Sequence, residues 1–133
     1  MRRTFAALCA VLLAANCSRT NTDFTEPPWN NIRVDVEVID GDVVFAWDGG
    51  GVRKLTVSEP LYAEGGGSVS PLWTIDTQGN DLLPSVVYGT VPEDASDTFG
   101  ADPLDSGVEF EVRLHRDLPG GQFEAGWATF LAP

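Results

Sequence analysis

The chain has 133 residues, of which 20 are Asp or Glu and eight are Lys or Arg, so its formal net charge at neutral pH is −12. A surface this acidic repels the phosphates of nucleic acids, which proteins bind through cationic side chains, and we therefore expect no nucleic-acid partner. The many Val, Leu, Phe and Trp residues can fill the core of one domain. The composition is not that of a disordered chain.

The N-terminal segment has the parts of an export signal. Arg2 and Arg3 precede an uncharged, apolar run over residues 5–15, in which small residues are frequent. This run is shorter than the about 20 residues that a membrane-spanning helix needs, and it has the length of a signal-peptide core. We therefore expect residues 1–16 to be a signal peptide and the protein to be exported.

Cys17 follows this core at the position of a lipid-attachment cysteine. Residues 13–17 (Leu-Ala-Ala-Asn-Cys) resemble the lipobox of bacterial lipoproteins, in which a cysteine is acylated and becomes the new N-terminus. The resemblance implies a membrane anchor at Cys17, in the outer membrane if the cell has one. The alternative is ordinary signal-peptide cleavage, which would release a secreted protein. Because Cys9 leaves with the signal, the mature chain has no second cysteine for a disulfide.

Residues 17–31 are polar and contain two prolines, which is typical of a flexible tether between an anchor and a domain. Loss of the signal removes Arg2 and Arg3, which leaves six basic residues against 20 acidic ones and a formal charge of −14. An anionic lipid surface repels such a chain. We therefore expect membrane contact through the lipid anchor alone.

After the tether, apolar residues alternate with polar ones, which is the pattern of strands that bury one face. In the clearest run, Val108, Phe110, Val112 and Leu114 alternate with charged residues. Glycine- and proline-rich turns separate such runs, and no helical period occurs. We therefore expect residues 32–133 to form one all-β domain, a seven-stranded immunoglobulin-like sandwich. The predicted strands are residues 32–38, 43–47, 52–59, 73–75, 86–88, 108–114 and 123–131, with loops at residues 60–71 and 89–107.

Two segments resemble fibronectin type III domains. Residues 43–47 (Val-Val-Phe-Ala-Trp) are similar to the second strand of that family, which carries a buried tryptophan. Residues 103–114 are similar to the turn into its sixth strand, with Phe110 where the family usually has a tyrosine. The resemblance implies a fibronectin type III-like sandwich. The alternation of Val43, Phe45 and Trp47 along this strand independently predicts that Trp47 lies in its core. It implies no activity, because such sandwiches have many unrelated functions.

His115 is the single histidine, and the alternation places it on the polar face of its strand beside Arg113. No Gly-x-Ser-x-Gly motif accompanies it, and a zinc site would need further ligands. We therefore expect a solvated histidine and a protein that is not an enzyme. The glycine runs at residues 49–51 and 65–67 are not followed by Gly-Lys-Ser/Thr, so we interpret them as turns rather than phosphate loops.

Residues 93–105 hold a dense cluster of carboxylates. Calcium takes several oxygen ligands, so this segment is a candidate calcium site, although it does not match the calcium loop of EF-hands. A solvated acidic loop is the alternative, and we expect no other cofactor. The candidate calcium ligands are Asp94, Asp97, Asp102 and Asp105.

Four aromatic residues are candidates for a sugar-binding platform, with packing in the core as the alternative. They are Trp29, Trp73, Tyr88 and Trp127.

The first functional hypothesis is a non-catalytic cell-envelope lipoprotein whose immunoglobulin-like domain serves structure or protein contact. The alternative is a carbohydrate-binding module displayed on the cell surface. A row of exposed aromatic residues on one sheet would favour sugar. A contiguous apolar patch would favour a protein partner, and a deep pocket with convergent carboxylates would favour an enzyme.

Overall fold

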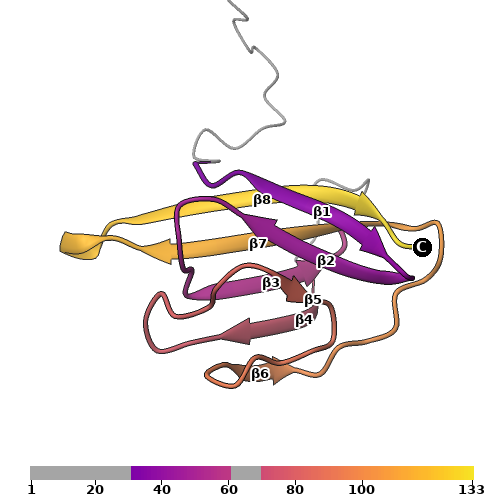
Figure 1. Ribbon diagram of the computed structural model, residues 1–133, viewed down its shortest axis with the longest axis horizontal. Helices are drawn as coiled ribbons and strands as arrows, with labels where there is room; N and C mark the ends of the chain where they lie inside the picture. Colours follow the sequence, from indigo (N-terminus) through magenta and orange to yellow (C-terminus); the bar gives the residue numbers. More distant parts are fainter. Residues whose placement is uncertain (1–30, 61–69) are drawn as a thin grey trace, which may run out of the picture.

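The computed structural model describes residues 31–60 and 70–133, and its described part is all-β, with two antiparallel sheets (Figure 1). The smaller sheet has the order β1-β2-β5 and consists of β1 (Val34–Ile39), β2 (Asp42–Trp47) and β5 (Val86–Val87). The larger sheet has the order β6-β4-β3-β7-β8 and consists of β3 (Lys54–Ser58), β4 (Pro71–Asp76), β6 (Ser96–Phe99), β7 (Glu109–Asp117) and β8 (Phe123–Leu131). A single turn of 3₁₀-helix, η1 (Pro119–Gly121), joins β7 to β8.

Several sequence-based predictions lie outside the described residues. They are the signal peptide at residues 1–16, the anchor at Cys17, the tether up to residue 30 with Trp29, and the glycine run at residues 65–67. Within the described residues, the structure contains no helix of the length and apolar character needed to cross a membrane.

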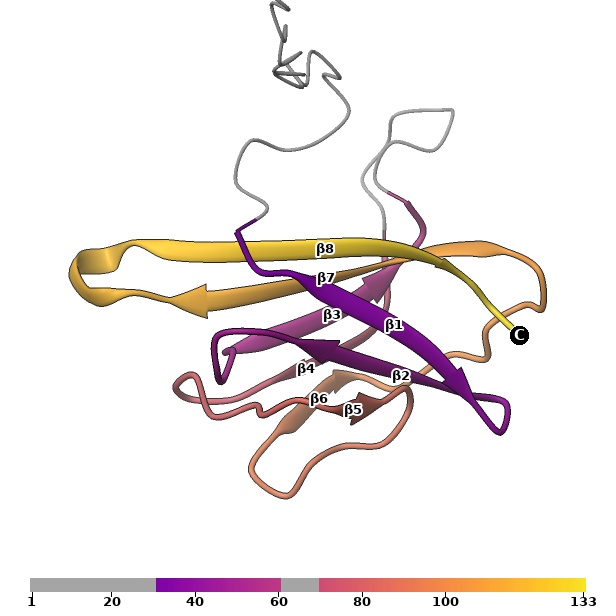
Figure 2. The ribbon, with the colours of Figure 1, turned by 45° about the horizontal axis from the view of Figure 1, so that its top comes forward.

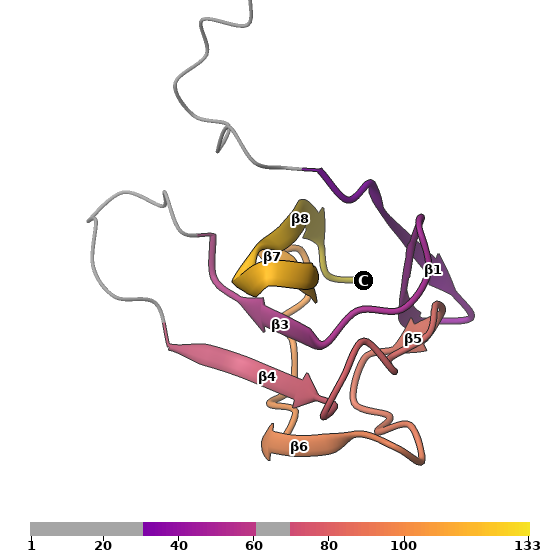
Figure 3. The same cartoon turned by 90° about the vertical axis from the view of Figure 1, so that its left-hand side faces the viewer.

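The two sheets form the layers of a sandwich-like fold. β1, β2 and β5 lie across one face of the larger sheet, and the end-on view shows β6, β4, β3, β7 and β8 following one another as a second layer (Figures 2 and 3). Side chains from both layers meet in one apolar core, in which Phe45 of β2 packs edge-on against Phe130 of β8 with ring centroids 5.5 Å apart. The predicted alternation of buried and polar residues is confirmed on β2 and β3, whereas Val38 of β1, which the alternation placed on the apolar face, is exposed.

Trp47 is buried at the end of β2, as the sequence predicts. Its Nε1 donates a hydrogen bond of 2.9 Å to the carbonyl oxygen of Gly50, so the one polar atom of the ring is satisfied inside the turn that follows. The inward-pointing residues of β7 are likewise buried: Phe110, Val112 and Leu114. Val108, which the alternation also placed in the core, is exposed because it lies just before β7 begins.

The described residues contain eight strands, one more than the sequence predicts. The additional strand, β6, lies in the segment expected to be a loop at residues 89–107 and pairs with β4. All four of its residues are exposed, so it has no buried face and no apolar alternation to reveal it. β6 is instead held by backbone pairing and by a hydrogen bond of 2.9 Å from Thr98 Oγ1 to Asp76 Oδ2.

The predicted turn at residues 49–51 is held by Arg116 of β7, whose side chain points to the smaller sheet. Its Nη2 donates to the carbonyl oxygens of Asp48 (2.7 Å) and Gly50 (3.0 Å), and its Nε donates to that of Gly51 (2.9 Å). Its Nη1 forms an ion pair of 2.9 Å with Glu124. The turn needs glycine, since Gly49 and Gly50 have φ values of 76° and 90°.

Tyr88 ties the long segment between β5 and β7 to the sandwich. Its hydroxyl donates a 2.6 Å hydrogen bond to the carbonyl oxygen of Asp102, and its ring packs edge-on against Trp73 with centroids 5.0 Å apart. Burial, and secondarily the nearby Asp102 carboxylate, raises the pKa of Tyr88 to about 12. The segment is therefore attached to the core although most of its residues are exposed.

Candidate ligand-binding face

The outer face of the larger sheet carries the residues that alternate with the core residues. In antiparallel sheets, directly paired residues point to the same face, so the strand register arranges these side chains in rows across the sheet. One row crosses all five strands and has an aromatic ring at each end. This transverse row consists of Phe99, Thr74, Thr56, Arg113 and Trp127.

The middle of the transverse row is polar. Thr74 Oγ1 lies within 3.4 Å of Thr56 Oγ1, and Arg113 follows on the next strand. A second row crosses the sheet beside the transverse row, two residues away along each strand, and has more charged side chains. It consists of Asp76, Lys54, His115 and Ala125. The face therefore offers aromatic rings at its margins and hydrogen-bonding groups between them.

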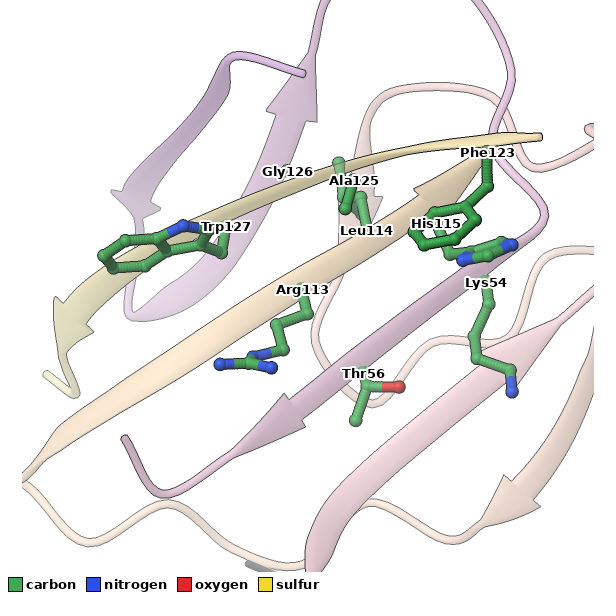
Figure 4. A pocket seen from close by; sticks show the side chains of 9 residues that line it. All are labelled: Lys54, Thr56, Arg113, Leu114, His115, Phe123, Ala125, Gly126 and Trp127. Carbon is green, nitrogen blue, oxygen red and sulfur yellow. The ribbon is translucent and has the colours of Figure 1, made fainter. Parts of the chain in front are cut away.

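A hollow with a volume of about 310 Å³ lies over β3, β7 and β8 (Figure 4). We call it the β8 hollow. Its two ends are formed by aromatic residues of β8, Phe123 at one end and Trp127 at the other, with Ala125 and Gly126 between them (Figure 4). On this face of β8 only the small side chain of Ala125 stands between the two rings, because Gly126 pairs with the inward-pointing Leu114. The hollow is completed on the other side by Lys54, Thr56, Leu114, Arg113 and His115.

Close packing against another part of the chain requires glycine at position 126. A Cβ atom at this position would lie 2.3 Å from the carbonyl oxygen of Ile32, because the chain crosses β8 closely there. The amides of Asn31 and Ile32 both donate to the carbonyl oxygen of Ala125, at 2.8 and 3.1 Å. The floor of the β8 hollow is thus fixed by the segment that enters the domain.

A second hollow, with a volume of about 360 Å³, lies over β4 and β6 and shares Lys54, Thr56 and Arg113 with the first. We call it the β6 hollow, and Phe99 lines it at the edge of the sheet. Phe99 is 50% exposed and Phe123 is 55% exposed. The two hollows together cross the sheet from one aromatic margin to the other.

His115 is held in place by two neighbours. Its ring stacks on Phe123, with centroids 4.9 Å apart and planes inclined by 20°, and its Nε2 lies 2.9 Å from Asp117 Oδ1. Arg53 Nη1 donates to the other oxygen of Asp117 at 2.9 Å. Hydrogen bonds from His115 and then from Arg53 lower the pKa of Asp117, since they favour its charged form.

Glu111 was predicted to be exposed on the polar face of its strand, but its side chain is only 2% exposed. It forms an ion pair with Nε of Arg113, whereas Nη2 of Arg113 is buried and has no hydrogen-bond partner among the described residues. The alternation correctly predicts the direction of Glu111 but not its burial. One end of the outer face is therefore covered, and the end with Phe123, His115 and Lys54 is open.

The aromatic residues named from the sequence separate into two groups. Trp73 is 0% exposed and belongs to the core, and Tyr88 packs against it. Trp127 lines the β8 hollow. Sequence reasoning missed Phe99, Phe123 and Lys54 as site residues, and the one available signal was that Lys54 is the single lysine of the chain.

The four aspartates named as calcium ligands are not brought together. Among the residues that the structure describes, which include Asp94, Asp97, Asp102 and Asp105, no three His, Cys, Asp or Glu side chains form a group that could hold a metal ion. Asp97 lies on β6, opposite Ile75, and the backbone of Asp102 is bonded to Tyr88 and Leu72. The geometry gives the calcium prediction no support.

Comparisons of the chain with models of protein families, with curated proteins and with solved structures found no match. The functional argument therefore rests on the outer face itself.

Proposed function

We propose that this protein is a non-catalytic, envelope-anchored carbohydrate-binding module, and that it binds sugar on the outer face of the larger sheet. The observation that carries the proposal is the transverse row with the two hollows beside it. A pyranose ring has an apolar face of C–H groups that stacks on aromatic rings, and its hydroxyl groups form hydrogen bonds around its edge. Phe99, Phe123 and Trp127 supply the rings, while Thr56, Lys54 and Arg113 supply polar groups between them.

This proposal takes up the alternative of the sequence analysis, because the criterion set there for sugar was a row of exposed aromatic residues on one sheet. Phe123 and Trp127 lie on the same face of β8, and Phe99 lies on the same sheet face four strands away. Among the described residues, a structural or protein-binding role, the first hypothesis, would rest on exposed apolar side chains such as Val38, Ile39 and Leu83.

The proposed fold identity is a fibronectin type III-like sandwich. Its support is the strand arrangement: the first, second and fifth strands form one sheet, and the third, fourth and last two form the other. Trp47 is buried at the end of β2, and Phe110 is buried on β7. β6 is then an additional edge strand on that plan. Phe110 lacks the hydroxyl group of the tyrosine that the family usually has at this position. Tyr88 has such a hydroxyl group, which bonds to the carbonyl oxygen of Asp102 in a different loop.

Binding is tested by affinity electrophoresis of the purified protein in gels that contain neutral or acidic polysaccharides. We expect retardation in at least one gel, and we expect Trp127→Ala and Phe123→Ala to weaken it at least about tenfold, as for buried aromatic anchors. Ile39→Ala, an exposed apolar residue of the smaller sheet, is the matched control and should bind like the wild type. Absence of retardation in every gel, or equal binding by all variants, would contradict the proposal.

The proposed absence of catalysis concerns His115 above all. The Nε2 atom that would act as a general base faces Asp117, and the ring lies against Phe123, so its geometry suits a wall of the binding site. We expect no shortening of a bound polysaccharide on prolonged incubation. Hydrolysis that persists in the wild type and disappears in a folded His115→Ala variant would show that the protein is an enzyme.

The anchoring proposal rests on the sequence alone: the basic start, the apolar core and the lipobox-like residues before Cys17. A diacylated cysteine carries more than one acyl chain, which is what stable membrane attachment requires. In cells, Cys17→Ser should move the protein from the membrane fraction to the soluble fraction or block processing, whereas Ser18→Ala should not. An unmodified mature N-terminus, measured by mass spectrometry, would show that the protein is secreted instead.

A further inference from the structure

Lys54 is the single lysine of an acidic chain, and it lies at the centre of the outer face. It is exposed and lines both the β8 hollow and the β6 hollow. It also lines a third, polar hollow with Arg53, Asp76 and His115. Its exposed side chain therefore borders all three hollows.

The other cations of the outer face and its strands are already engaged. Arg53 is paired with Asp117, Arg113 with Glu111, and Arg116 with Glu124 as well as with three carbonyl groups. In the part of the chain that the structure describes, Lys54 forms no ion pair. A charge without a partner is expected to attract a ligand group of opposite sign more strongly than a neutralised one.

The carboxylate opposite Lys54 does not neutralise it. Asp76 is its cross-strand partner on β4, but Oδ2 of Asp76 accepts the hydrogen bond from Thr98 Oγ1, on the side toward β6. No oxygen of Asp76 lies within ion-pair distance of the Lys54 ammonium group. The carboxylates of Glu111 and Asp117 are likewise engaged with arginines.

The charged residues that line the three hollows therefore balance when they are counted together with their ion-pair partners, whereas the chain as a whole carries −12. Three carboxylates (Asp76, Glu111, Asp117) face three permanent cations (Arg53, Lys54, Arg113) there. The repulsion from the remaining acidic surface is screened over about 8 Å at physiological ionic strength. An anionic ligand is thus repelled least on the face that carries the aromatic rings.

We infer that the sugar bound here is acidic, and that Lys54 binds the carboxylate of a uronic acid unit whose ring lies in the β8 hollow. The inference rests on the proposed carbohydrate binding and names its ligand class. Lys54 lines the same hollow as the stacked pair of His115 and Phe123 (Figure 4). Arg113, which lines the same hollow, is already paired with Glu111, so Lys54 is the group that discriminates charge.

The test compares polygalacturonate with the same polymer after full methyl esterification, which turns each carboxylate into an uncharged ester, and with a sulfated polysaccharide that has no carboxylates. Binding is measured by calorimetry in the presence of a calcium chelator. We expect polygalacturonate to bind about tenfold or more tightly than its ester, as for one charge-assisted hydrogen bond. Lys54→Met should abolish this preference, so that the variant binds both polymers with equal affinity. Arg33→Met removes one positive charge that lines none of the three hollows and should keep the preference.

The outcomes separate this inference from the proposed function. Equal affinity for both polymers, lost in Trp127→Ala, would overturn the acidic ligand and leave carbohydrate binding intact. No binding to any polymer would overturn both. Tighter binding of the sulfated polymer than of polygalacturonate would assign Lys54 to a sulfate and overturn the carboxylate. Loss of the preference in Arg33→Met as well would show a general charge effect and would also overturn the role of Lys54.

Discussion

The two faces of the larger sheet are built from the same strands and differ in what fixes their side chains. On the inner face, Trp73, Phe110 and Val112 are packed against the smaller sheet, and their positions follow from exclusion of water. On the outer face, Arg113 and His115 are held by neighbouring polar and aromatic groups, and small residues leave hollows between them. The comparison indicates that stability depends mainly on the inner face, whereas the proposed ligand binding would depend on the outer one.

The largest expected effect tests this division with the same substitution on each face. Trp73→Ala removes a fully buried ring and should lower the free energy of unfolding by about 3–5 kcal/mol. Trp127→Ala should cost only about 1 kcal/mol, because its ring lies at the margin of the sheet, and should weaken sugar binding instead. Urea unfolding of both variants measures the difference. Equal losses in the free energy of unfolding would show that both faces contribute equally to stability.

The next largest effect is expected at Arg116, a charged residue that stabilises the fold rather than the proposed binding face. Arg116→Ala should lower stability by about 2–3 kcal/mol, since its side chain holds three carbonyl groups and Glu124. Arg116→Lys should recover little of this loss, because an ammonium group cannot reach the same set of acceptors. Arg33→Ala, at an exposed arginine, is the control and should stay within about 0.5 kcal/mol.

Glu111 sharpens the comparison because it lies on the outer face but is buried. Glu111→Gln keeps the shape and removes the charge, so it should cost about 1–2 kcal/mol through its ion pair with Arg113. Glu109→Gln changes an exposed carboxylate of the same strand and should have almost no effect. A stability change in thermal unfolding that is the same for both would mean that burial of Glu111 has no energetic consequence.

The smallest effect is expected at Tyr88. Tyr88→Phe removes the hydrogen bond to Asp102 and should cost about 1 kcal/mol at neutral pH. In the folded protein the pKa of Tyr88 is about 12, above the ordinary value near 10, so the folded state holds this proton more tightly than the unfolded state. Its contribution is complete below pH about 10 and is lost as the pH rises through about 12. The wild type should therefore lose more stability than Tyr88→Phe over this range, and parallel curves would contradict the raised pKa.

The inner face was predictable from the sequence and the outer face was not. Alternation alone assigned Val43, Phe45 and Trp47 to the core, because burial of one strand face depends on the residues of that strand. The relation of Lys54 to Arg113 and Phe123 depends instead on which strands are neighbours and in what register. The sequence contains no local signal for that pairing, and β6, which has no apolar face, was interpreted as part of a loop.

The aromatic residues show the same limit. Composition makes Trp73 and Trp127 equivalent, yet β4 turns the first inward and β8 turns the second outward. The polar alternation likewise predicts that Glu111 and His115 point the same way, but it cannot predict that one is buried and the other open. These differences in burial depend on which residues are neighbours in the folded chain, and the strand pattern alone does not contain that information.

The transverse row also has a shape that a flat drawing of the sheet conceals. Neighbouring strands lie about 4.8 Å apart, so the row from Phe99 to Trp127 extends over about 19 Å. Neighbouring strands of a sheet are also rotated by roughly 20–25° relative to one another, so this row turns through about 80–100° along its length. A polymer chain that follows it must coil in the same sense. The rigid, planar surface of a crystalline fibre would touch one margin only, so the proposed ligand is expected to be a single hydrated chain.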